Sequence, residues 1–249
     1  MNPPGPHAAD AKRAQPGSLR RGTQRSKSAA EVVGVVLAGG AGSRLGRSKA
    51  GLRLPPGSPG EPGPTLVEWA TARLGATPRI GEILVAGDGA AIEPPANVRT
   101  ASVTAVGDGP GAGPAAGVLG AARARSGASL LVLACDLPLA PVGLLSALAS
   151  SAADLAAAAG DVSDRWTMNL TCALWTPPAL GVLASRAAGG DFRLYPLAGC
   201  SGLTIEPVAA APFGNPDDVL LNVNTADDWD RARRLFDPRS PAALRLAAT

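Results

Sequence analysis

Histidine and cysteine are scarce in this sequence of 249 residues, and each shortage excludes a class of chemistry. The single histidine, His7, lies near the amino terminus, so the body of the chain has no Ser-His-Asp triad, Cys-His pair or histidine metal site. Three scattered cysteines, Cys135, Cys172 and Cys200, are too few for a disulfide framework and are typical of a reducing cytosol. We therefore expect a cytoplasmic protein in which any metal binds oxygen ligands, which favours Mg²⁺.

Lysine is also scarce, and its one position in the body of the chain is informative. After residue 30 every basic residue is an arginine except Lys49, which closes a glycine-rich run over residues 35–49. An ammonium is a compact point charge, whereas a guanidinium is a planar fork, so a lysine at this position indicates a phosphate contact. Glycine amides together with Arg44 and Lys49 can approach phosphate oxygens. The run is not a Walker P-loop, because Gly46 and Lys49 are not adjacent.

Charge and composition divide the chain into three parts. Residues 1–30 are basic, rich in Pro, Gly, Ser, Gln and Arg, and lack a hydrophobic core, which predicts a disordered leader rather than a secretory signal. The remainder is mildly acidic, which argues against nucleic-acid binding. We expect one domain over residues 31–238 and a C-terminal tail over residues 239–249. The apolar stretch 128–149 contains Asp136 and two prolines, so it predicts a buried strand, a turn and a helix rather than a membrane span.

Runs of β-branched residues alternate with helical patterns, which predicts an α/β fold: a three-layer α/β/α sandwich around a mainly parallel, Rossmann-like sheet. The expected strands are residues 31–38, 82–86, 97–106, 129–134, 170–175 and 203–208. The expected helices are residues 66–74, 115–125, 142–149, 179–188 and 226–236. Residues 154–159 fit either a short strand or a short helix. A Pro/Gly-rich insertion over residues 55–64 is expected to bulge from the surface.

Polar candidates follow several of these strands. Ligands of open parallel sheets bind beyond the carboxyl ends of the strands. The glycine loop, the Gly/Pro run 107–114 and Asp136 are all expected at that edge. A carboxylate at a strand end suits Mg²⁺, although a helix N-cap before Pro138 is an alternative role for Asp136. The sequence likewise leaves two roles open for Asn222 and Asn224: substrate contact or turn formation.

The motifs together resemble a known family. The pattern L-A-G-G-x-x-x-R-x-G-x-x-K over residues 37–49 is similar to the signature of nucleotidyltransferases, and most closely to that of the molybdenum cofactor guanylyltransferases. The resemblance continues through Gly-Pro-Ala-Ala-Gly at 113–117, Leu-Ala-Cys-Asp-Leu-Pro at 133–138 and Asn-Val-Asn-Thr at 222–225, in the family's order. It extends over about residues 32–236 and implies the nucleotidyltransferase fold.

The resemblance also implies roles for individual residues. The residues expected to contact the nucleotide are Leu37, Ala38, Gly39, Gly40 and Asp108. The residues expected to act in catalysis are Arg44, Lys49 and Asp136, with Lys49 neutralising phosphates and Asp136 binding Mg²⁺. Asn222 and Asn224 are expected beside the pterin substrate and the metal. Cys135 is expected to be a small core residue, and Trp166, next to Arg165, is a weaker candidate for substrate contact.

The implied reaction transfers GMP from GTP to the terminal phosphate of molybdenum–molybdopterin, releasing pyrophosphate and forming the guanine dinucleotide cofactor. Expected partners are GTP and molybdopterin, with transient contact to other molybdenum cofactor biosynthesis proteins and with neither nucleic acid nor membrane. The alternatives are the cytidylyltransferase of the same cofactor, a sugar-phosphate nucleotidyltransferase and a nucleotide-binding module without catalysis. Departures from the family pattern at Ser48, at residues 86–88 and at residues 168–170 leave the base and the acceptor open.

Overall fold

The computed structural model describes Met1 and residues 32–39, 49–56, 60, 62–87, 102–106 and 113–236. In these residues one seven-stranded sheet has the order β3-β2-β1-β4-β6-β5-β7. The strands are β1 (Val32–Leu37), β2 (Ile80–Ala86), β3 (Ser102–Val106), β4 (Ser129–Ala134), β5 (Leu155–Ala159), β6 (Met168–Trp175) and β7 (Ile205–Ala209). Each expected strand region holds a strand, and residues 154–159, which fitted either element, contribute β5.

One strand runs against its neighbours. β1 pairs in parallel with β2 and β4, and β5 pairs in parallel with β7, whereas β6 is antiparallel to both β4 and β5. Because β6 reverses direction relative to both neighbours, β4 and β5 run the same way and their carboxyl ends share one edge of the sheet. The mainly parallel sheet is confirmed. The reversal at β6 was not predicted, because a buried apolar run carries no signal of strand direction.

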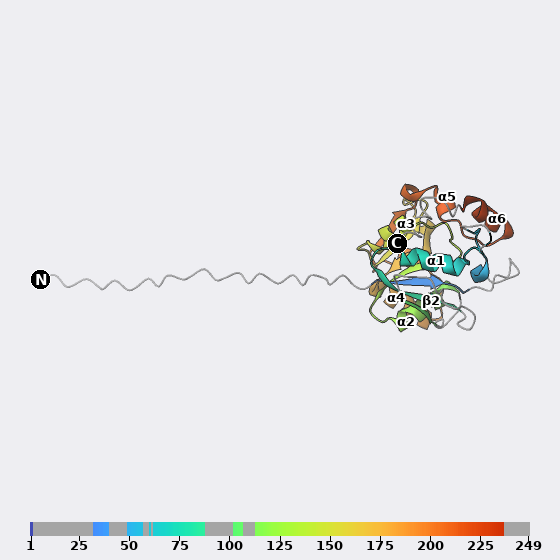
Figure 1. Cartoon of the computed structure of the whole chain (residues 1–249). Helices are drawn as coiled ribbons and strands as arrows, with labels where there is room; N and C mark the ends of the chain where they lie inside the picture. Colours follow the sequence, from blue (N-terminus) through green and yellow to red (C-terminus); the bar gives the residue numbers. More distant parts are fainter. Residues whose placement is uncertain are drawn as a thin grey trace.

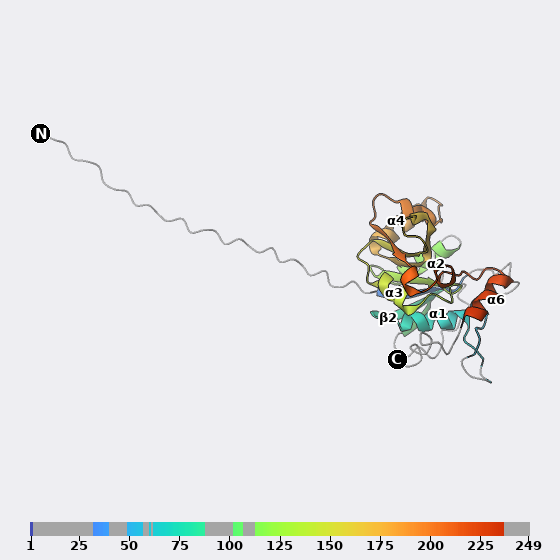
Figure 2. The same ribbon diagram turned by 90° about the horizontal axis from the view of Figure 1, so that it is seen from above.

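Helices cover both faces of the sheet, which confirms the three-layer sandwich. They are α1 (Leu66–Gly75), α2 (Pro114–Ala124), α3 (Val142–Ala149), α4 (Pro177–Ala188), α5 (Pro216–Val219) and α6 (Ala226–Leu235). Short 3₁₀ turns are η1 (Lys49–Gly51), η2 (Arg165–Thr167), η3 (Tyr195–Gly199) and η4 (Ala211–Phe213). α1 lies beside α3 on one face, and α2 lies beside α4 on the other (Figure 1). Figure 2, seen from above, shows α6 next to one end of α1.

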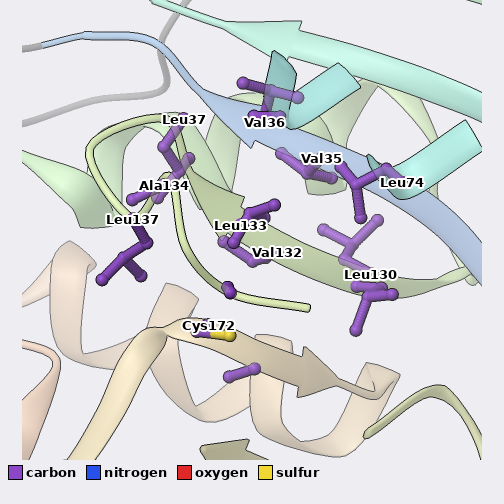
Figure 3. Packing of buried hydrophobic residues seen from close by; sticks show 14 of the residues in the cluster. Val35, Val36, Leu37, Leu74, Leu130, Val132, Leu133, Ala134, Leu137 and Cys172 are labelled. Atoms are coloured by element: carbon purple, nitrogen blue, oxygen red, sulfur yellow. The ribbon is translucent and has the colours of Figure 1, made fainter. Parts of the chain in front are cut away.

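The core is built from aliphatic side chains at the centre of the sheet. Every residue of β1, β4 and β5 is buried, as is the whole of Trp175 at the end of β6. Figure 3 shows Val35, Leu133 and Cys172 within this cluster, where β1, β4 and β6 lie side by side. Burying one leucine or valine side chain contributes about 1.5–3 kcal/mol, so the adjacent buried strands β1 and β4 form a rigid base for the loops at their ends.

The apolar stretch 128–149 folds as the sequence predicts: β4, a turn and α3. None of the helices in the described ranges has the length and apolar character that crossing a membrane requires.

The segment after η1 forms a narrow hairpin that leads into α1. The amide of Leu54 donates to the Pro64 carbonyl at 2.9 Å, and Arg53 and Thr65 form an antiparallel bridge. Thr65 then caps α1 in a reciprocal capping box with Glu68. Of the described residues in the expected insertion, Pro56, Gly60 and Pro62 are exposed, whereas Gly63 is buried against this hairpin.

Candidate functional site

The carboxyl ends of β1 and β4 lie directly beside each other. The amide of Cys135 donates to the Leu37 carbonyl at 3.1 Å, and the amide of Ala38 donates to the Ala86 carbonyl at 2.7 Å. These bonds continue the ladder one residue beyond the strands. They bring the start of the glycine loop, Ala38 and Gly39, to the same edge as Asp136.

Lys49 connects three parts of the chain that are far apart in sequence. Its Nζ donates to Asp136 Oδ2 at 2.9 Å and to Asn224 Oδ1 at 2.5 Å. The side chains of Lys49 and Asp136 are each only 18% exposed. Partial burial strengthens such an ion pair relative to one at the surface. The structure therefore places the lysine of the glycine loop in contact with the strand-end carboxylate and with the second motif asparagine.

Two oxygen atoms in this cluster lack partners. Among the described residues, the buried atoms Asp136 Oδ1 and Asn222 Oδ1 accept no hydrogen bond. Unpartnered buried acceptors are costly, by about 1–3 kcal/mol each, and in native proteins they usually meet an ion, a water or a ligand. Carboxylate and amide oxygens are ligands that Mg²⁺ accepts. The unpartnered carboxylate oxygen of Asp136 is therefore of a type that fits a magnesium ion, and the unpartnered amide oxygen of Asn222 is a second oxygen of that type.

The backbone around Asp136 is held from two sides. The amide of Val223 donates to the Asp136 carbonyl at 2.8 Å, which docks the Asn-Val-Asn-Thr segment against the end of β4. On the other side, Trp69 Nε1 donates to the Pro138 carbonyl at 2.8 Å, and the Arg73 guanidinium donates to the Ala140 carbonyl. Burial lowers the pKa of Arg73 to about 10, so this side chain remains charged at neutral pH. Trp69 is therefore a structural residue that holds the turn after Asp136 in place.

Asn224 is held by the start of α6. The carboxylate of Asp228 accepts from the amides of Asn224 and Thr225, at 3.0 and 2.8 Å, and Thr225 Oγ1 accepts from the Asp228 amide in return. Desolvation acts to raise the pKa of Asp228. Hydrogen bonding with the Thr225 side chain and with the two amides, together with the charge of Lys49, outweighs it and lowers that pKa. Asp228 therefore stays ionised and keeps Asn224 in place.

Cys135 precedes the carboxylate but has no nucleophilic character. Burial raises the pKa of its thiol to about 12, with a further contribution from Asp136 and a smaller opposing one from Lys49. Because the thiolate is the reactive form of cysteine, this group is inert at neutral pH. The expectation that Cys135 is a core residue is confirmed.

The structure brings together Lys49, Asp136 and Asn224, all expected from the sequence, and the Val223 amide docks the segment that contains Asn222 against Asp136. Leu37, Ala38 and Gly39 lie at the same edge, while Gly40, Arg44 and Asp108 fall outside the described residues. Sequence reasoning missed Asp228, although the spacing Thr225-x-x-Asp228 is a recognisable capping signal. The hydrogen bonds that Trp69 and Arg73 of α1 donate beyond β4 could not be predicted from local sequence, because the bonded residues are 69 and 67 positions apart.

A family profile described as a MobA-like NTP transferase domain matches residues 34–227. A molybdenum cofactor guanylyltransferase of Acidiphilium cryptum is 31% identical over 204 residues, which cover 80% of this chain and 92% of that protein. Molybdopterin-guanine dinucleotide biosynthesis protein A from Archaeoglobus fulgidus has a similar structure, with a TM-score of 0.61, 21% identity, and coverage of 82% of this chain and 97% of that one.

A 2-C-methyl-D-erythritol 4-phosphate cytidylyltransferase from Thermus thermophilus is similar at a TM-score of 0.56 and 20% identity, over 82% of this chain and 98% of that one. Likeness to solved structures at these identities concerns the fold alone. The fold is therefore shared by proteins named for guanine and for cytosine nucleotides.

Proposed function

This chain belongs to the family of MobA-like NTP transferase domains and is a nucleotidyltransferase of molybdenum cofactor biosynthesis, and on that premise we propose a guanylyl transfer. The donor is GTP and the acceptor is the terminal phosphate of molybdenum–molybdopterin. An acceptor phosphate oxygen forms a bond to the α-phosphorus as the bond between the α- and β-phosphates breaks. Pyrophosphate leaves with the electron pair, and the product is a dinucleotide.

The observation that carries this proposal is the contact of Lys49 with Asp136 and Asn224 at the carboxyl edge of the sheet. Phosphoryl and nucleotidyl transfers need little covalent participation by the protein. They need in-line positioning and cations placed against the charge that develops on the leaving group. Lys49 is the cation for that charge, and Arg44 is a second one expected from the sequence.

Asp136, with Asn222 and Asn224, would hold Mg²⁺. Bound there, the metal would neutralise phosphate oxygens and orient them for displacement. The orphaned Oδ1 atoms of Asp136 and Asn222 support this assignment. In this scheme Lys49 bonds to Asp136 Oδ2 and Asn224 Oδ1 in the free protein. Once the nucleotide is bound, Lys49 contacts the triphosphate instead.

The choice of GTP rests on the 31% identical relative named for guanylyl transfer and on the motifs over residues 37–49 and 222–225. Leu37, Ala38 and Gly39 would contact the nucleotide through the backbone, joined by Gly40 and by Asp108 near the ribose or base. We further propose a cytoplasmic location, in keeping with three cysteines that form no disulfide in the described residues, and transient contact with other proteins that handle the cofactor.

The test compares Asp136→Ala with Asp217→Asn, which removes one exposed carboxylate outside the Lys49–Asp136–Asn224 cluster. Pyrophosphate release from GTP in the presence of molybdenum–molybdopterin should disappear in Asp136→Ala at every magnesium concentration, with an unchanged circular dichroism spectrum. Asp217→Asn should turn over like the wild type. Wild-type turnover in Asp136→Ala would refute the assignment of the site.

A nucleotide panel tests the base. Wild-type protein is incubated with acceptor and with GTP, CTP or ATP in separate reactions. Turnover with GTP alone supports guanylyl transfer, and turnover with CTP alone would replace it by cytidylyl transfer. Calorimetric binding of GTP without pyrophosphate release, even with acceptor present, would instead indicate a binding module.

A further inference from the structure

Two exposed aromatic side chains lie together in a chain that has few aromatics. The sequence has one tyrosine, four tryptophans and three phenylalanines. Its tyrosine, Tyr195 on η3, and Trp166 on η2 are each 58% exposed. Their ring centroids are 6.5 Å apart with an interplanar angle of 63°. Exposed aromatic surface is costly to leave in water, and a pair of this kind is typical of a contact surface.

Trp166 is held in place although it is exposed. Its backbone amide donates to Asp164 Oδ1 at 2.9 Å. Its six-membered ring edge lies over Gly199, so close that a Cβ added at that glycine would be 2.7 Å from Trp166 Cη2. The glycine therefore leaves room for the indole, which packs against backbone on one side and presents the remainder to solvent. A ring fixed in this way loses little conformational entropy when a ligand stacks on it.

Cationic groups adjoin the two rings. The Arg193 Cζ lies 5.9 Å from the Tyr195 ring centroid, and Arg193 is fixed by two hydrogen bonds to Asp191, at 2.9 and 3.0 Å. Hydrogen bonding to Asp191 also raises the pKa of this guanidinium. Arg165 precedes Trp166 and is exposed. The surface therefore combines two flat aromatic faces with the guanidinium groups of Arg165 and Arg193, of which Arg193 is paired with Asp191, and this combination suits a planar heteroaromatic ligand.

The pair lies at the ligand edge of the sheet. η2 lies between the carboxyl end of β5 and the start of β6, and β5 runs in the same direction as β4. Trp166 therefore shares an edge with Asp136, on the β6-β5 half of the sheet. Ala38 and Gly39, which begin the glycine loop, follow β1 on the other half of the sheet, which also contains β2 and β3. With the nucleotide on the β1 side, the β6-β5 side is left for the acceptor.

We propose that Trp166 and Tyr195 form the stacking surface for the fused heteroaromatic ring of the acceptor, with Arg193 beside it. This inference rests on the proposed function, since it assigns the ring of the pterin acceptor to these two residues and its phosphate to the Lys49–Asp136 cluster. Trp166 and Tyr195 are then determinants of acceptor specificity, whereas binding of GTP does not depend on them.

The test uses Trp166→Ala, Trp166→Phe and Tyr195→Ala, with Val162→Ala as a control that shortens a nearby exposed apolar side chain. Loss of a stacking ring should raise the KM for molybdenum–molybdopterin about tenfold, with kcat and the KM for GTP within about twofold of wild type. Trp166→Phe should recover most of the affinity, and Val162→Ala should behave like wild type. Unchanged thermal unfolding of each variant shows that the fold is intact.

A second measurement does not require turnover. Binding of 6-carboxypterin to the full chain is followed by quenching of the pterin fluorescence, and Trp166→Ala should weaken it about tenfold. This arm remains decisive if the nucleotide is not GTP, so failure of the stacking surface can be told apart from failure of the proposed function. Equal pterin affinity in wild type and Trp166→Ala, or no binding to either, would overturn the proposal. A dimer of wild type that Trp166→Ala abolishes in sedimentation would assign the surface to a second copy instead.

Discussion

Lys49 and Asp136 are 87 residues apart in the chain, and their side chains form an ion pair of 2.9 Å at the carboxyl edge of the sheet. The same ammonium bonds to Asn224, so it occupies two oxygens at which a divalent cation would bind. In the free protein a resident positive charge therefore pairs with Asp136 Oδ2, while Oδ1 has no partner. The ammonium therefore competes with a metal ion for Asp136 Oδ2 and Asn224 Oδ1.

Lys49→Met should bind Mn²⁺ more tightly than wild type in the absence of nucleotide. Removing the ammonium frees Asp136 Oδ2 and Asn224 Oδ1 and removes a repelling charge at close range. We expect about a tenfold gain in affinity, or about 1.4 kcal/mol, measured by electron paramagnetic resonance of free Mn²⁺. Turnover should nevertheless fall about 10²–10³-fold, because the leaving group loses its cation. The double variant Lys49→Met, Asp136→Asn should lose the gain, and weaker Mn²⁺ binding in the single variant would contradict the competition.

Lys49→Arg should also lose activity although it keeps the charge. The ammonium lies between two acceptors at 2.9 and 2.5 Å in a partly buried space, where a planar guanidinium has a different size and donor geometry. A decrease in kcat of about tenfold or more is expected, on the order of the cost of misplacing one catalytic donor. The measurement is pyrophosphate release at saturating GTP. Full activity would mean that this position requires only a positive charge.

Asp228 should stabilise the folded protein by an amount that depends on pH. Its pKa is lowered in the folded protein, so the contribution is present above the unfolded value of about 3.9 and is lost as the pH falls through the lower folded value. Asp228→Asn should therefore lower the free energy of unfolding at pH 7 by about 0.5–1 kcal/mol, as expected for an acidic group at a helix N-terminus. Urea unfolding of both proteins should show this difference shrinking below about pH 4. A difference that persists at pH 2.5 would exclude the charge as its cause.

Two Gly→Ala substitutions should have opposite effects. A Cβ at Gly63 would lie 1.8 Å from the Leu54 carbonyl oxygen, so Gly63→Ala must open the hairpin that leads from Lys49 to α1. Gly181 lies on the exposed face of α4, and a Cβ there would meet nothing within 4 Å. Gly181→Ala should therefore raise the free energy of unfolding by about 0.5–1 kcal/mol, the helix-propensity difference. Gly63→Ala should lower it by about 1–3 kcal/mol, as overpacking does. Chemical denaturation measures both, and equal midpoints would refute the steric argument.

Local sequence patterns predicted most of the fold. The β-branched run that ends at Leu37 and the run that ends at Ala134 indicated buried strands, because continuous apolar segments of that length fit a sheet covered on both faces. Thr65 indicated the start of α1 as a helix cap, and the structure adds Glu68 as its reciprocal capping partner. The reversal of β6 could not be read in this way, since direction depends on which strands become neighbours.

By itself the sequence determined which side chains carry the chemistry: one lysine at the end of a glycine loop, a carboxylate after a buried strand, and two asparagines around a valine. Each is a local feature, set by residue type and spacing. Only the tertiary structure decided that Lys49, Asp136 and Asn224 meet, and that Trp166 and Tyr195 lie together on the same edge as Asp136. Such contacts depend on strand order and direction. Both are set when the whole core packs, and neither can be predicted from the periodicity of the sequence.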